Sequence, residues 1–275
     1  MNAFTMYFKH DLNQLFKRKS IKIYYGVLTT LILIDIMISH SSAIHFEFME
    51  FKASAFNYLF LENSDGFLKN LYFFIMPIIA SFAFSTQYYI EKKNNFHINL
   101  IVRGNRWSYL LSKFTINYIV GFFTIFYILI LNYGIVLLTY QHSFVLGDNV
   151  IPPDNGSAFE NIFYANAYLY QFVYIIINAL IGGMFSVLAF SLTLLIKYKN
   201  KFMVIAVPFI IYIMSSIYIY CIDFHYDLLH IIQPITRFAL TIPITNTHVI
   251  YAISTWYIIT LVIFYIGYKR EKDLL

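Results

Sequence analysis

Six long apolar stretches dominate the sequence and limit what the chain can fold into. A helix that crosses a bilayer needs roughly 20 mainly apolar residues. The stretches cover residues 23–39, 71–90, 114–138, 169–196, 202–221 and 249–268. Their apolar runs are continuous, without the alternation that marks the wall of a β-barrel. The sequence therefore predicts an all-α integral membrane protein, with one transmembrane domain over residues 1–275 and six transmembrane helices.

Composition agrees with this class of protein. The chain is 60% hydrophobic and 12% charged, whereas an average soluble domain is about 25% charged. This excludes a soluble globular enzyme, because too few charged side chains remain to cover its surface. Cys221 is the only cysteine, which excludes a disulfide framework and a cysteine-ligated metal site.

The distribution of basic residues predicts the orientation of the six spans. Lysine and arginine accumulate in the cytoplasmic loops of membrane proteins. With a cytoplasmic N-terminus, 16 of the 19 basic residues lie inside, and only Lys52, Lys69 and Arg237 lie outside. We therefore expect both termini to be cytoplasmic.

Residues 1–22 precede the first span and show a helical pattern. The apolar residues that share one face of this helix are Phe4, Phe8, Leu12, Leu15 and Phe16. Asp11 lies at the edge of that face and interrupts it slightly. The pattern predicts an amphipathic elbow helix in the cytoplasmic interface, with a frayed basic tail as the alternative. No small-residue cleavage site follows the first apolar run, so a removable signal peptide is not expected.

Residues 91–107 form the one inner loop with a helical segment of its own. Its charged residues are Glu91, Lys92, Lys93, Arg103 and Arg106. Gly104 is expected to end a short helix before the third span. Because such a helix lies in the cytoplasm between two spans, it is the best candidate for docking a partner protein.

The outer loop at residues 222–247 is unusually apolar and is interrupted by Pro234 and Pro243. It is too broken to span a membrane and too apolar to lie in water, which favours short re-entrant helices in the outer leaflet.

Polar residues within the spans are few. Asp35 is the only acidic one, and it is either a functional carboxylate or a hydrated group near the outer end of its short span. Asn132 and Asn178 are expected to form hydrogen bonds between helices. A stripe of small residues predicts close helix packing. It consists of Ala179, Gly182, Gly183 and Ser186.

Motifs for the common membrane chemistries are missing. The sequence has no phosphate-binding loop, no His-Glu-x-x-His zinc signature and no Gly-x-Ser-x-Gly elbow. His225 and His230 lack a third ligand and are expected to be interfacial histidines. The sequence thus predicts no catalytic residues, no metal site, no cofactor of its own and no nucleic-acid partner.

The order of these parts resembles the membrane subunit of bacterial ABC-2 type (type V) exporters. In that family an elbow helix precedes six spans, a coupling helix lies between spans two and three, and re-entrant helices lie between spans five and six. The corresponding segments are residues 4–17, 91–104 and 222–247. The stretch from Arg103 to Lys113 resembles the family's entry into span three. One departure is the long outer loop at residues 141–167.

The resemblance implies a set of partners. It implies a cytoplasmic ABC ATPase subunit that carries the ATP and Mg²⁺, a second permease copy or paralogue, and the lipids of a bacterial cytoplasmic membrane. The segment with Glu91, Lys92, Lys93, Arg103 and Arg106 would then be the coupling helix that contacts the ATPase.

The substrate is the least constrained part of this interpretation. Nine acidic residues against three basic ones on the predicted outer side favour export of amphipathic or antimicrobial peptides. Lipid-linked glycans are the alternative substrate, because Lys17, Arg18, Lys19 and Lys22 could bind a pyrophosphate at the inner side. Two other classes stay open: a membrane-embedded enzyme such as a lipid-modifying acyltransferase, and a channel, receptor or secondary transporter.

Overall fold

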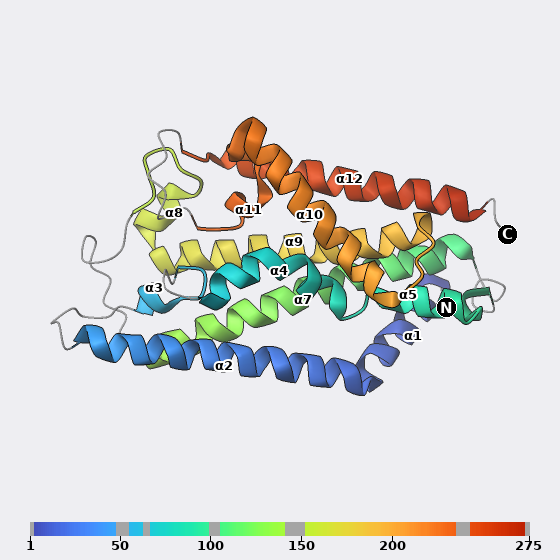
Figure 1. Ribbon diagram of the computed structural model, residues 1–275, viewed down its shortest axis with the longest axis horizontal. Coiled ribbons are helices and arrows are strands. Elements are labelled where there is room, and N and C mark those ends of the chain that lie inside the picture. The colour runs from blue at the N-terminus through green and yellow to red at the C-terminus, as the bar shows by residue number, and fades with distance from the viewer. Residues whose placement is uncertain are drawn as a thin grey trace.

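The computed structural model describes residues 3–47, 55–62, 67–98, 105–140, 152–234 and 243–272. No strand occurs among these residues, and most of them are helical. The long helices run along the longest axis of the molecule, and both termini lie at the same end (Figure 1). The predicted all-α architecture is confirmed.

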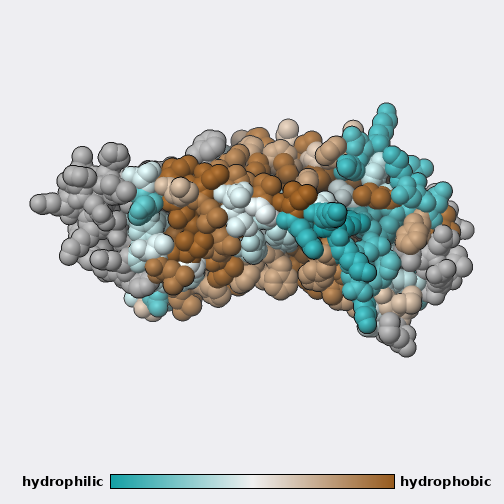
Figure 2. Space-filling model, turned by 90° about the horizontal axis from the view of Figure 1, so that it is seen from below, coloured by the Kyte–Doolittle hydropathy of each residue, from teal (hydrophilic) through white to brown (hydrophobic). Residues whose placement is uncertain are grey.

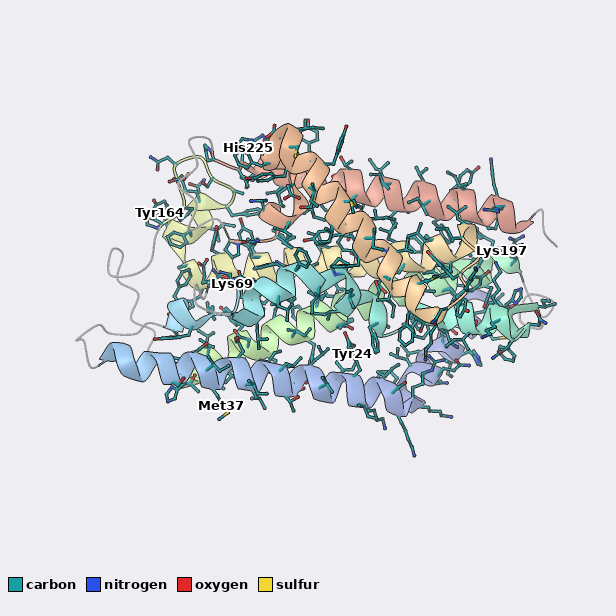
Figure 3. All side chains as sticks on the ribbon, in the orientation of Figure 1. Tyr24, Met37, Lys69, Tyr164, Lys197 and His225 are labelled. Atoms are coloured by element: carbon teal, nitrogen blue, oxygen red, sulfur yellow. The ribbon has the colours of Figure 1, made fainter. Side chains whose placement is uncertain are left out.

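Six helical segments are long and apolar enough to cross a membrane, as the sequence predicts. They are Lys19–Ser41, Leu68–Lys93, Arg106–Thr139, Ala167–Leu195, Lys201–Tyr226 and Asn246–Arg270. The long helices that contain them are α2 (Lys19–Glu47), α4 (Phe67–Phe82) with α5 (Thr86–Lys93), α7 (Arg106–Thr139), α9 (Ala167–Leu195), α10 (Lys201–Asp223) and α12 (Asn246–Lys272). Apolar residues cover much of the middle of the face seen in Figure 2. Met37 of α2 projects from the bundle within this region (Figure 3). The chain has the make-up of a multi-pass membrane protein.

Shorter helices occupy the two ends of the bundle. They are α1 (Ala3–Lys17), α3 (Ala55–Tyr58), α8 (Glu160–Ala165) and α11 (Leu228–Ile231), with a 3₁₀ turn at Phe224–Tyr226. We call the end that holds both termini, α1 and α5 the basic end. Its described lysines and arginines are Lys9, Lys17, Arg18, Lys19, Lys22, Lys92, Lys93, Arg106, Lys113, Lys197, Lys199, Lys201, Lys269, Arg270 and Lys272. The end with α3, α8 and α11 is the opposite end.

The second apolar stretch is two helices rather than one. A turn at residues 83–85 separates α4 from α5. The Ser85 hydroxyl donates to Ser186 O at 3.0 Å, and the Ser81 hydroxyl donates to Phe185 O at 3.4 Å. The polar groups around the break are thus bonded to α9, which is how irregular backbone is tolerated at membrane depth.

α9 is the central helix, and α4, α7, α10 and α12 pack against it. The seam with α7 is built from small residues. A Cβ atom on Gly121 would lie 2.5 Å from Ser186 Cβ and 2.7 Å from Gly182 O, and one on Gly183 would lie 3.0 Å from Tyr118 O. Ala179 is fully buried in α9. The predicted small-residue stripe therefore lies where two long helices approach closely, and Gly121 is the α7 residue that meets it.

The predicted re-entrant segment is described at its two ends, residues 222–234 and 243–247. The 3₁₀ turn and α11 follow α10, and Leu228, Ile231 and Ile232 are buried in the main apolar core. Residues 235–242 lie outside the described part of the chain. The long loop at residues 141–167 is described from residue 152, where Ala158 N donates to Ile244 O at 2.7 Å, just before α12.

Candidate functional site

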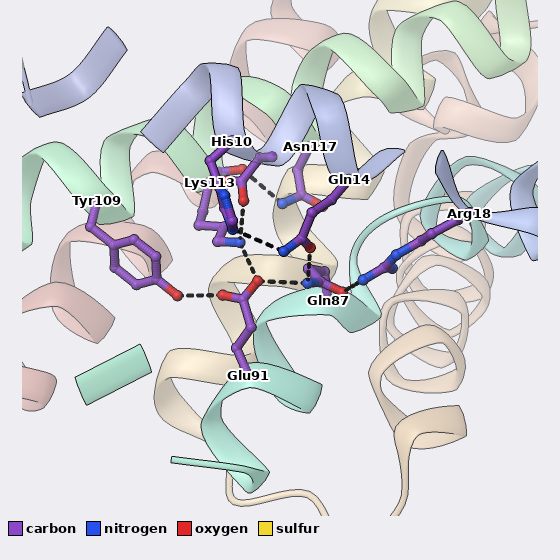
Figure 4. A network of polar contacts seen from close by, with 9 residues as sticks. His10, Gln14, Arg18, Gln87, Glu91, Tyr109, Lys113 and Asn117 are labelled. Atoms are coloured by element: carbon purple, nitrogen blue, oxygen red, sulfur yellow. Dashed lines mark hydrogen bonds and ion pairs between the residues drawn. The ribbon is translucent and has the colours of Figure 1, made fainter. Parts of the chain in front are cut away.

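A cluster of buried ionisable side chains lies at the basic end, where α1, α5 and α7 meet (Figure 4). Lys113 of α7 is at its centre and is 0% exposed. Its Nζ lies 2.8 Å from Asp11 Oδ1 of α1 and 2.7 Å from Glu91 Oε1 of α5. One lysine therefore pairs with two carboxylates from two other helices. We call this cluster, with the polar residues bonded to it, the basic-end network.

Neutral and basic groups complete the hydrogen bonds of Glu91. The Tyr109 hydroxyl donates to Glu91 Oε2 at 2.6 Å, and Gln87 Nε2 donates to Glu91 Oε1 at 2.6 Å. Gln87 also donates to Gln14 Oε1 at 2.8 Å and accepts a hydrogen bond from the Arg18 guanidinium. Gln14 of α1 and Arg18, which follows α1, thus both reach α5 through the Gln87 amide.

The sequence of α1 suits this position because it has both a polar and an apolar contact surface. Tyr7 and Asp11 are its fully buried residues, and the Tyr7 ring packs edge-on against Tyr109 at 5.5 Å. The apolar residues that pack near α7 and the α4–α5 turn are Phe8, Leu12 and Leu15. Phe16, predicted on the same apolar face, is 67% exposed. Asp11, which interrupts the amphipathic pattern, is thus the residue that fixes α1 to the bundle.

Burial changes the pKa values of two groups in this network. Burial raises the pKa of the Asp11 carboxyl, and the nearby Lys113 ammonium opposes that rise. Burial lowers the pKa of the Arg18 guanidinium, and the Glu91 and Asp11 carboxylates oppose that fall. Loss of hydration therefore outweighs the attraction of the partner at Asp11, as is usual for charges taken out of water. The network serves to position three helices more than to add stability.

The structure gives Glu91 partners within the chain, and its predicted role in docking stays a prediction. The sequence places it on the charged surface of a docking segment, but its carboxylate is buried and bonded to Lys113 and Tyr109. Glu91 therefore takes part in contacts within the chain. Lys92 and Lys93 follow it at the end of α5, where Lys92 is half-buried and Lys93 is exposed.

Arg103 and Arg106 are the other two predicted docking residues, and the structure describes only Arg106. Arg106 begins α7, where its Nη2 donates to Tyr268 O at 3.3 Å and its guanidinium carbon lies 5.6 Å from the Tyr268 ring centroid. It therefore links α7 to the last turns of α12. Arg103 lies outside the described residues.

Asn132 and Asn178 lie in the opposite half of the bundle. Both bind the backbone of short segments, and Asn178 also has the partner on another long helix that the sequence predicts. Asn132 Oδ1 accepts from Phe60 N at 2.9 Å. Asn178 Nδ2 donates to Ile232 O at 2.8 Å, just after α11, and the Tyr72 hydroxyl of α4 donates to Asn178 Oδ1 at 3.2 Å. Non-helical backbone inside a membrane needs such partners.

Asp35 is not part of either polar region. It is buried on α2, and no hydrogen bond or ion pair to it occurs within the described part of the chain. The functional role considered for it stays a prediction.

Sequence analysis missed Asp11, Gln14, Gln87, Tyr109 and Lys113 as site residues. The signal for two of them was present: Asp11 interrupts an apolar face, and Lys113 enters the third span. Each is an ionisable residue at a position that membrane helices usually leave apolar. The two glutamines and the tyrosine have no comparable signal, because they become informative only once their partners are known.

The chemistry available in the described residues is limited. No three His, Cys, Asp or Glu side chains among them are placed to hold a metal ion. Two histidine–aspartate pairs lie near the opposite end, His225 with Asp223 at 2.5 Å and His230 with Asp227 at 2.8 Å. The basic-end network is the larger arrangement. It can hold α1, α5 and α7 in fixed register and carry a displacement of one to the others.

No family model, curated protein or solved structure matches the chain. The resemblance to ABC-2 exporters therefore rests on the order of the parts and on the residues named in the sequence analysis.

Proposed function

We propose that the chain is the membrane subunit of an exporter in a bacterial cytoplasmic membrane, driven by a separate ABC ATPase subunit that docks on the basic end. The observation that carries the proposal is the link from Glu91 through Lys113 to Asp11. It joins the end of the second span to the helix before the first span and to the third. A partner that moves α5 would thereby move α1 and α7.

The docking surface in this proposal begins at Lys92 and Lys93 and continues into the segment with Arg103. Glu91 precedes this surface in the chain and is bonded to Lys113 in the basic-end network. Charge reversal in the variant Lys92→Glu/Lys93→Glu should weaken co-purification of the ATPase subunit and lower ATP hydrolysis of the complex about tenfold or more. The matched control is Lys197→Glu/Lys199→Glu, which makes the same charge change at exposed sites on another loop of the basic end. Normal co-purification and export by the first variant would overturn the docking assignment.

The proposal requires both termini in the cytoplasm, which labelling of single cysteines can test. In a Cys221→Ser background, a membrane-impermeant thiol reagent should label Asp154→Cys in intact cells and should leave Lys93→Cys unlabelled. Both positions are exposed, so access to the reagent depends on the side of the membrane. Labelling of Lys93→Cys alone would reverse the orientation.

Cationic amphipathic peptides are the proposed substrate class, with a second membrane subunit completing the pathway. Not all of the acidic residues predicted on the outer side lie at the surface, because Glu62 and Asp227 are buried. Asp154, Glu160 and Asp223 are the acidic residues with described side chains that are left to attract cations at that end. Deleting the subunit should raise sensitivity to such peptides or retain them in the cell. Unchanged sensitivity together with altered cell-wall glycan would favour lipid-linked glycans instead.

A further inference from the structure

A groove separates α2 from the helices beside it at the basic end. A cavity of about 180 Å³ lies between the start of α2, the α4–α5 turn and the first residues of α10. Its polar lining consists of Arg18, Ser20, Thr86 and Lys201. Its apolar lining includes Tyr24, Phe82 and Ile205. The cavity therefore presents two cations and two hydroxyls above an apolar floor.

The charged residues that line this cavity are all basic. No acidic side chain is among the residues that line it. The Arg18 guanidinium also reaches the Gln87 amide, which holds the arginine side chain beside the cavity, and Lys201 is exposed at the first residue of α10. Arginine and lysine side chains with free hydrogen-bond donors are the usual protein groups for binding phosphate.

A second, apolar cavity lies further along α2. It has a volume of about 70 Å³ and lies between α2, α4 and α7. Among its lining residues are Leu28, Ile32, Leu71, Ile75 and Ile79. From Arg18 to Ile32 the helical rise of α2 is about 21 Å, which is close to the length of an extended acyl chain.

Tyr24 of α2, labelled in Figure 3, lines the charged cavity and is one turn from Leu28, which lines the apolar one. Its hydroxyl donates to Ile79 O at 2.7 Å, and its ring centroid lies 5.0 Å from that of Phe82. An acyl chain that runs along α2 from the charged cavity to the apolar one would pass this pair of rings.

We propose that the groove binds one anionic phospholipid from the leaflet at the basic end. Its phosphate lies between Arg18 and Lys201, and one acyl chain follows α2 past Tyr24 toward Leu28 and Ile32. Basic pockets between membrane helices recognise acidic lipid headgroups in this way. The absence of acidic lining residues favours a lipid of net negative charge over a zwitterionic one. The proposal is independent of the exported substrate.

Native mass spectrometry of the full chain can test this proposal. The protein would be released from bilayers of equal phosphatidylglycerol and phosphatidylcholine, and the lipids that stay bound would be counted. We expect one phosphatidylglycerol to be retained in preference to phosphatidylcholine. Lys201→Gln should reduce that preference about fivefold. Lys199→Gln, an equal charge change outside the lining, should leave it unchanged. Arg18 is left intact because it also contacts the basic-end network.

A second variant tests the cavity itself without changing a charge. Thr86→Phe should fill the space above Phe82 and reduce the bound phosphatidylglycerol, and its thermal unfolding in detergent would show that the chain stays folded. Millimolar inorganic phosphate should not displace the lipid, because the acyl chain supplies much of the binding. Equal retention of both lipids by the unmodified chain, equal effects of Lys199→Gln and Lys201→Gln, or displacement by free phosphate would each overturn the proposal.

Discussion

The two ends of the bundle solve the problem of buried polar groups in different ways. At the basic end, charged side chains meet one another: Lys113 pairs with Asp11 and Glu91 across three helices. In the opposite half, neutral amides meet backbone: Asn132 binds Phe60 N, and Asn178 binds Ile232 O.

The difference shows what each region requires. The backbone near α3 and α11 is not continuous helix, so its N–H and C=O groups need partners wherever water is excluded. The amides supply them with little electrostatic penalty. The helices at the basic end form their own backbone hydrogen bonds. The buried charges there lose hydration on folding, and their ion pairs fix α1 against α5 and α7. We therefore expect the basic end to be more sensitive to loss of one residue.

The largest effect is expected for Lys113→Met. It leaves the carboxylates of Asp11 and Glu91 buried together without their cation, and removing one partner of a buried ion pair costs about 3–5 kcal/mol. Thermal unfolding in detergent would measure the loss. The triple variant Lys113→Met/Asp11→Asn/Glu91→Gln should recover most of it, because no charge then remains unpaired.

The exposed Lys93→Met serves as the control for Lys113→Met and should unfold like the unmodified protein. A small effect of Lys113→Met alone would contradict the difference between the two ends. It would mean that the carboxylates find water or another cation.

A smaller effect is expected in the seam that joins the two regions. Gly121→Ala places a Cβ 2.7 Å from the backbone oxygen of Gly182, and overpacking of this kind costs about 1–3 kcal/mol. Gly134→Ala is the matched control in the same helix, because nothing lies within 4 Å of its added Cβ. It should be neutral or slightly stabilising, since glycine within a helix is less stable than alanine by roughly 0.5–1 kcal/mol. Equal unfolding temperatures for the two variants would show that α7 and α9 are not in close contact.

The smallest of these losses is expected for Asn178→Ala at the opposite end. It removes the bond to Ile232 O, and hydrogen bonds between membrane segments are worth about 0.6–2 kcal/mol. Limited proteolysis after α11, compared with Asn178→Asp, would detect release of that segment. A loss of stability as large as that caused by Lys113→Met would contradict the difference between the neutral amides of the opposite half and the charged groups of the basic end.

The sequence predicts the six spans well, because hydrophobic length is a local property that each stretch carries by itself. It also predicts the small-residue stripe of α9, whose spacing is local too. It does not predict the basic-end network, because Lys113 and Asp11 are 102 residues apart and only the fold brings them together. For the same reason Glu91 looks like a surface charge in the sequence, and Asn178 gives no sign that its partner is a backbone carbonyl 54 residues away.

The central claim is that α1 is packed into the bundle at the basic end. An elbow helix that only floats in the interface could not carry a movement of α5. Tyr7 is the residue to test, because it is 2% exposed and its ring lies 5.5 Å from that of Tyr109. A photoreactive benzophenone amino acid can replace Tyr7, and the same amino acid at the exposed Phe16 is the control.

After irradiation in membranes, mass spectrometry would identify what each position has bound. We predict that position 7 forms a crosslink to the peptide that contains Tyr109, whereas position 16 forms mainly lipid adducts. Lipid adducts at position 7 to the same extent as at position 16 would contradict the account, because α1 would then lie apart from α5 and α7.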